Sequence, residues 1–133
     1  MSTSKLQQTL QVLDPLIRTL PADAILTPSS PTYKLHSEPF AIQKQLYPPV
    51  VFVPKTVDVL AKIVAFVYKT NLDFAVRGRG FKSPSAEHVI ISMMEFNSFE
   101  YDTEKKLATV GVGASWADVV RRMEEVDPEY SRK

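Results

Sequence analysis

Cysteine is absent from this sequence of 133 residues, and histidine occurs only at His36 and His88. Without cysteine the chain can form no disulfide, no thiolate metal site, no cysteine nucleophile and no cysteinyl link to a cofactor. The two histidines lack metal-ligand spacing, so we expect no metal site and two structural or exposed side chains. The serines lie outside any G-x-S-x-G frame, and no carboxylate pair has a hydrolase-like spacing, so the catalytic residues are unknown at this level.

A dense charge of one sign and a long hydrophobic run are also lacking. The 16 basic and 15 acidic residues give a formal net charge of +1 and are scattered along the chain, which argues against nucleic-acid binding. No stretch approaches the roughly 18 consecutive apolar residues of a membrane span. The N-terminal residues do not form the hydrophobic core of a signal peptide. We therefore expect a cytoplasmic protein that contacts neither nucleic acid nor membrane.

Hydrophobic residues make up 44% of the chain, which is enough for one globular domain with a sizeable core. In residues 5–20 the apolar side chains recur at spacings of three or four, which predicts a helix, and Pro15 could start a second helix there. Residues 21–49 hold most of the prolines together with several aromatic and apolar residues. This composition predicts an extended segment that docks against the core.

The pattern from residue 50 onward predicts a strand, a helix and a second strand. Residues 50–53 form a continuous β-branched and aromatic run, typical of a strand buried on both faces of a parallel sheet. Thr56 can cap a helix with a broad apolar face that ends near Lys69. Residues 72–76 then form the second strand. A unit of this length closes as a parallel crossover, so we expect a mixed α and β fold.

The second half of the chain predicts a further strand, a hairpin and a helix. Residues 89–92 form a short apolar strand, and residues 99–112 contain two strand-like runs around a polar connection, which indicates a hairpin. Ser115 starts a helix with capping-box spacing, and Asp127, followed by proline, stops it. We expect Trp116, at the start of this helix, to be a core anchor, with stacking on a ligand ring as the alternative.

The loop at residues 77–83, which reads Arg-Gly-Arg-Gly-Phe-Lys-Ser, carries the most chemical information. Gly78 and Gly80 leave a predicted buried strand together, and no helix begins at once, unlike a Rossmann turn. Glycine permits positive φ and close approach of the backbone to a ligand, so successive N–H groups can converge on phosphate oxygens. The three cationic side chains of the loop would strengthen such contacts, because charge-assisted hydrogen bonds are about twice as strong as neutral ones.

Two alternatives to a diphosphate site stay open for this loop. Its glycines can simply shape a tight turn with solvated cations beside it, and the loop lacks the G-K-[ST] ending of a Walker loop. It can also bind some other phosphate-bearing nucleotide. The loop alone does not distinguish these possibilities.

Five motifs in register give the chain a family resemblance. They are P-P-V-V-F-V-P (48–54), F-A-V-R-G-R-G-F (74–81), V-I-I-S-M (89–93), F-N-S-F-E-Y-D (96–102) and A-T-V-G-V-G-A-S-W-A-D-V (108–119). In this order they resemble the PCMH-type FAD-binding domain of the vanillyl-alcohol oxidase and berberine-bridge-enzyme-like family, over about residues 25–127. The resemblance implies an α+β fold, with an N-terminal α/β lobe of a small parallel sheet and helices, followed by a β-hairpin and a helix. Residues 1–24 would form an N-terminal helical segment and residues 25–133 a partial FAD-binding domain.

The resemblance also implies which residues bind the cofactor. The loop backbone would wrap the FAD pyrophosphate through Gly78, Arg79, Gly80, Phe81, Lys82 and Ser83, with Arg77 bracing the loop. Gly113 would belong to a second glycine turn near the cofactor, although glycines before a capped helix are also common as plain turns. The family often has a flavin-linked histidine where this chain has Phe81, so FAD would be bound noncovalently.

The implied activity is that of an FAD-linked oxidoreductase, similar to fungal FAD-linked oxidases, which suggests a role in fungal secondary metabolism. Family members are several hundred residues long, with a second lobe and a substrate domain, and we expect this chain to be truncated before both. A small-molecule substrate would then be handled only if the missing lobe is supplied. The alternative is a truncated, non-catalytic remnant or interaction module that associates through exposed apolar surface.

Overall fold

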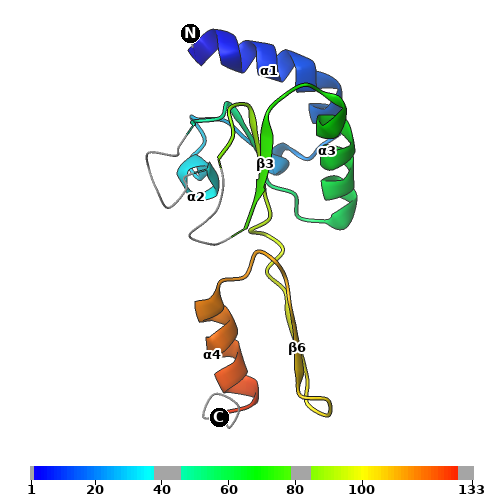
Figure 1. Ribbon diagram of the computed structural model, residues 1–133, viewed down its shortest axis with the longest axis vertical. Helices are drawn as coiled ribbons and strands as arrows, with labels where there is room; N and C mark the ends of the chain where they lie inside the picture. The colour runs from blue at the N-terminus through cyan, green and yellow to red at the C-terminus, as the bar shows by residue number, and fades with distance from the viewer. Residues whose placement is uncertain (1, 38–45, 79–84, 129–133) are drawn as a thin grey trace.

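The computed structural model describes residues 2–37, 46–78 and 85–128 and confirms the predicted α+β class (Figure 1). In chain order, the elements are α1 (Ser2–Ile17), the 3-10 helix η1 (Ala22–Ala24), β1 (Ile25–Leu26), α2 (Tyr33–Ser37), β2 (Val50–Phe52), α3 (Val57–Lys69), β3 (Phe74–Arg77), β4 (Val89–Ser92), β5 (Phe99–Asp102), β6 (Leu107–Val110) and α4 (Trp116–Val126). The predicted division of the chain after residue 24 stays a prediction.

A four-stranded sheet in the order β1-β2-β4-β3 organises the first two thirds of the fold. β1 is antiparallel to β2, whereas β2, β4 and β3 are parallel to one another. The predicted crossover from β2 through α3 to β3 is therefore parallel, and β4 inserts between its two strands. The carboxyl ends of the three parallel strands lie at one edge of the sheet, where Arg77 is the register partner of Ser92.

Both faces of this sheet are covered, because successive strand side chains point to opposite faces. On one face, helices α1 and α3 form a buried cluster with the strands, made of Leu13, Leu16, Val50, Phe52, Ile63, Val67, Val89 and Ile91. On the other face, α2 contributes to a second cluster, made of Tyr33, Val51, Val53 and Ile90. The unbroken apolar run at residues 50–53 thus serves two cores, as the sequence predicts.

Local corrections concern the first 49 residues. Pro15 lies inside α1 instead of starting a second helix, because the buried Leu13 and Leu16 on either side hold this turn in the core. The segment 21–49 is not uniformly extended, since it contains η1, β1 and α2. Its docking is confirmed for Tyr33, which is buried and donates a hydrogen bond of 2.7 Å to the carbonyl oxygen of Pro48.

The remaining elements form a hairpin with a helix beside it. β5 and β6 pair antiparallel, as predicted, and Figure 1 shows α4 alongside them, away from the four-stranded sheet. Ser115 caps α4 by accepting a hydrogen bond of 3.2 Å from the N–H of Asp118. At the other end, Asp127 accepts hydrogen bonds of 2.8 Å from the Tyr101 hydroxyl and 3.3 Å from the Lys106 ammonium. These bonds tie the helix end to the hairpin.

No helix among residues 2–37, 46–78 and 85–128 combines the length and the apolar character that crossing a bilayer requires.

Candidate functional site

The glycine loop begins at the carboxyl edge of the parallel strands. β3 ends at Arg77, and Gly78 is the first residue after it. Ligands of open α/β sheets bind in the crevice outside the carboxyl ends of the strands, so this is the edge at which a cofactor is expected. The other predicted loop contacts, Arg79, Gly80, Phe81, Lys82 and Ser83, lie outside the described residues.

Gly78 lies directly against the second glycine segment, residues 111–113. A Cβ atom on Gly78 would lie 2.9 Å from the carbonyl oxygen of Val112, which is closer than real Cβ atoms approach. The structure therefore brings together two segments that are far apart in the sequence and that the resemblance assigns to one site. None of the described glycines has positive φ. The missing side chain of Gly78 therefore serves close backbone approach, the other of the two properties that glycine offers at this place.

Gly111 and Gly113 have equally clear packing reasons. A Cβ atom on Gly113 would collide with the carbonyl oxygen of Met93 and would lie 2.6 Å from that of Met94. A Cβ atom on Gly111 would collide with the carbonyl oxygen of Phe96. The N–H of Gly113 also donates a hydrogen bond of 2.8 Å to Phe96. These contacts support the plain-turn alternative for Gly113, and its contact with FAD stays a prediction.

Polar side chains are buried where the strands end. Arg77 is 6% exposed, and its carbonyl oxygen accepts a hydrogen bond of 2.8 Å from the N–H of Met93. Nδ1 of the buried His36 lies 2.7 Å from Oγ of Ser92. Nδ1 of His88 accepts a hydrogen bond of 3.0 Å from the N–H of Asp73, just before β3. Each histidine thus has a hydrogen-bonding partner within the fold, and the described segments contain no group of three residues suited to a metal ion.

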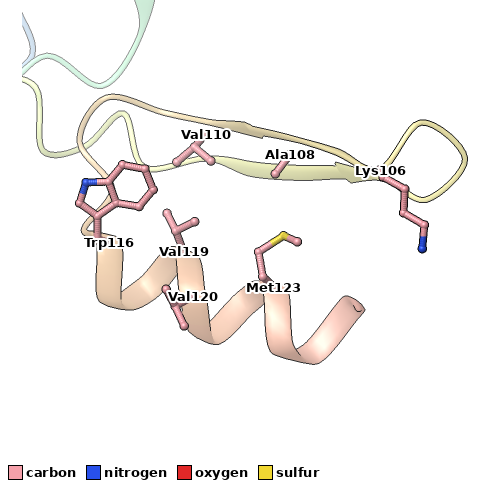
Figure 2. A pocket seen from close by; sticks show the side chains of 7 residues that line it. All are labelled: Lys106, Ala108, Val110, Trp116, Val119, Val120 and Met123. Atoms are coloured by element: carbon pink, nitrogen blue, oxygen red, sulfur yellow. The ribbon is translucent and has the colours of Figure 1, made fainter. Parts of the chain in front are cut away.

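A groove lies between α4 and β6 that the sequence did not predict, and Trp116 lies at its edge. The groove has a volume of about 540 Å³ and is lined by Lys106, Ala108, Val110, Trp116, Val119, Val120 and Met123 (Figure 2). Trp116 is 81% exposed, so the prediction of a core anchor is wrong. The physical reason is that α4 leaves β6 uncovered, as all four residues of that strand are exposed. Apolar alternation in β6, which places Ala108 and Val110 on one face, was the available signal.

Comparison with known proteins decides the family. Residues 48–127, more than half of the chain, match the model of a family described as an FAD binding domain. The chain belongs to this family. Its cofactor is FAD, and the predicted FAD-binding domain is confirmed.

This chain resembles parts of two larger redox proteins. An uncharacterized oxidoreductase, ORF5 in the fasciation locus of Rhodococcoides fascians, is 35% identical over 77 residues, which cover 55% of this chain and 17% of that protein. The FAD-dependent monooxygenase tpcD of Cochliobolus heterostrophus is 33% identical over 71 residues, which cover 50% of this chain and 14% of that protein. The chain thus matches less than a fifth of the length of these relatives.

Solved structures support the fold of the FAD-binding domain. Phl p 4, a grass pollen allergen with glucose dehydrogenase activity, superposes with a TM-score of 0.71 at 16% identity, covering 88% of this chain and 27% of that one. A variant of BBE-like 1 from Physcomitrella patens gives a TM-score of 0.69 at 17% identity, covering 86% of this chain and 26% of that one. At such identities the likeness shows the fold alone.

Proposed function

We propose that this FAD-binding domain holds FAD noncovalently, with the pyrophosphate on the loop at residues 77–83, as part of an FAD-linked oxidoreductase. The observation that carries the proposal is the contact between Gly78 and residues 111–113 at the carboxyl edge of the sheet. Gly78, which lacks a side chain, meets the carbonyl oxygen of Val112 there, next to the buried Arg77, which would brace the start of the loop. Glycine lets the backbone of the loop approach phosphate oxygens closely.

The side chains of the loop fit the same ligand. Arg79 and Lys82 would supply positive charge for a diphosphate, and Gly113 belongs to the segment 111–113 that lies against the start of the loop. FAD supplies the redox chemistry when bound, whereas the protein supplies binding and orientation. The substrate pocket and the catalytic base would be supplied by regions that correspond to the parts of the larger relatives that this chain does not match. A role in fungal secondary metabolism and a cytoplasmic location belong to the same proposal.

Noncovalent attachment follows from the side chains that the chain offers. Phe81 occupies the position of the family's flavin-linked histidine, and cysteine is absent. His36 lies against Ser92 in the interior, and His88 bonds the backbone of Asp73. We expect acid precipitation of the FAD-loaded protein to leave a colourless pellet and all flavin in the supernatant. Flavin that stays with the pellet would contradict this part of the proposal.

The binding site is tested by charge reversal in the loop. The double variant Arg79→Glu, Lys82→Glu should weaken FAD binding by at least about tenfold, because it replaces two charge-assisted contacts with repulsion. The matched control is Lys62→Glu, Lys105→Glu, which reverses the same charge on exposed positions of α3 and of the hairpin turn. Both variants would be titrated with FAD by calorimetry at constant salt. Equal affinities for the two variants would refute the loop as the pyrophosphate site.

Competition identifies the nucleotide. A ligand that prefers the folded state raises the melting temperature, so FAD should stabilise the protein more than NAD or ATP at equal concentration. A larger shift with NAD or ATP would favour a different nucleotide site in this loop.

The exposed groove favours a second candidate function, a non-catalytic interaction module. Two of the residues that line it, Val120 and Trp116, are 50% and 81% exposed. Contiguous exposed apolar surface marks sites of association. The two functions separate on flavin content: purified protein with stoichiometric flavin supports the redox domain, whereas protein that stays colourless in excess FAD supports the module.

A further inference from the structure

A buried polar cluster lies under α2 at the carboxyl edge of the sheet. Of the five buried polar or charged side chains in the described segments, four come from α2 or from the ends of β3 and β4, namely His36, Ser37, Arg77 and Ser92. Ile90 belongs to the core beneath α2, so Ser92, two residues later, points to the same face. Its register partner Arg77 does likewise. Burying polar groups is costly unless they are hydrogen-bonded, so this cluster requires a reason.

Ser92 connects the helix α2 to the turn after β4. Its Oγ lies 2.7 Å from Nδ1 of His36 on one side. On the other side the same oxygen accepts a longer hydrogen bond, of 3.5 Å, from the N–H of Met94. The first of these contacts is wholly buried and links residues 56 positions apart in the sequence. His36 therefore fixes the hydroxyl that holds residues 93–94 in place.

Both glycine segments rest on this turn. The N–H of Met93 donates to Arg77, the last residue before the loop. The carbonyl oxygens of Met93 and Met94 are the atoms against which Gly113 packs, and the neighbouring Val112 carbonyl contacts Gly78. A displacement of the turn would therefore move the start of the loop and residues 111–113 together.

We propose that His36 is a positioning residue for the flavin site, which acts through Ser92 and the turn at residues 93–94. The proposal rests on the proposed function, because it assumes that FAD binds at the two glycine segments. His36 need not touch FAD. Its effect arises because binding groups must be held within a fraction of an ångström of their productive positions by the residues behind them.

The test compares two buried hydrogen bonds of the same helix. His36→Leu and Ser92→Ala each remove the contact at the carboxyl edge. His36→Asn restores a polar atom close to the position of Nδ1. The control is Tyr33→Phe, which removes the buried 2.7 Å hydrogen bond from α2 to Pro48, ahead of β2 and away from the glycine segments. FAD affinity would be measured by calorimetry well below the melting temperature of each variant, and thermal stability separately.

We expect His36→Leu and Ser92→Ala to weaken FAD binding by at least about fivefold, the order expected from one buried hydrogen bond. His36→Asn and Tyr33→Phe should stay within about twofold of the parent, although Tyr33→Phe lowers the melting temperature as well. Parent-like FAD affinity of Ser92→Ala would overturn the proposal, and so would a loss of FAD affinity in Tyr33→Phe equal to that in Ser92→Ala. Both outcomes can be measured even if His36→Leu fails to fold. A parent protein that binds no FAD would instead refute the proposed function, and this inference with it.

Discussion

Replacing Gly113 by alanine should destabilise the protein strongly, whether or not FAD is present. The new Cβ would collide with the Met93 carbonyl oxygen and lie 2.6 Å from that of Met94, and neither is the flexible end of a side chain. Overpacking of this kind costs about 1–3 kcal/mol. The hydrogen bond of 2.8 Å from Gly113 to Phe96 would be strained as well, at about 0.5–1.5 kcal/mol. We therefore expect a loss of about 2–4 kcal/mol, a large share of the roughly 5–15 kcal/mol by which domains are stable.

Urea unfolding followed by far-ultraviolet circular dichroism measures this loss of unfolding free energy. In thermal unfolding, the melting temperature should fall by roughly 8–16 °C. Val112→Ala is the matched control, since it alters the neighbouring side chain, which is 67% exposed, and should cost less than about 0.5 kcal/mol. A Gly113→Ala protein that unfolds within about 0.5 kcal/mol of the parent would refute the packing argument. The same result would revive a purely ligand-based reason for this glycine.

Three further predictions follow from single contacts. Ser115→Ala and Thr56→Ala remove the caps of α4 and α3, so each should cost about 0.5–2 kcal/mol in urea unfolding, and no loss would contradict the capping bonds. Burial raises the pKa of Tyr33 above its ordinary value of 10.0. Because the unfolded chain then releases this proton first, stability should fall as pH rises above about 10, and less so in Tyr33→Phe. Fluorescence of Trp116, the only tryptophan, should be that of solvent-exposed indole and change little on unfolding, whereas a blue-shifted folded spectrum would show a buried ring.

Local patterns predicted the elements well because each depends on neighbouring residues. Thr56 accepts a hydrogen bond from the N–H of Val59, as its position before an apolar repeat indicates. The polar connection between β5 and β6 forms the expected hairpin. The predicted apolar face of α3 is only partly buried, because Ile63 and Val67 are buried whereas Val57 is 70% exposed. Periodicity shows that a helix has an apolar side, but the angle at which it meets the sheet decides which residues are covered.

Features that depend on distant partners could not be predicted. The insertion of β4 between β2 and β3 depends on pairing across the chain, and so does the contact between His36 and Ser92. The exposure of Trp116 also depends on distant parts of the fold and could not be predicted from neighbouring residues. Its place at a capped helix start was evident, but its burial depends on an element over β6 that the described chain does not supply.

The glycines of the chain now separate into two groups that a binding experiment can distinguish. Gly78, Gly111 and Gly113 would each bring a Cβ onto backbone atoms of the protein itself. Loss of FAD binding in Gly78→Ala could therefore follow from displacement of Val112, and it should be accompanied by loss of stability. Gly80, the fourth glycine of the sequence, lies outside the described residues. If its backbone contacts the pyrophosphate, Gly80→Ala should weaken FAD binding while urea unfolding of the apoprotein changes little, and parent-like affinity would argue that the loop does not enclose the phosphates.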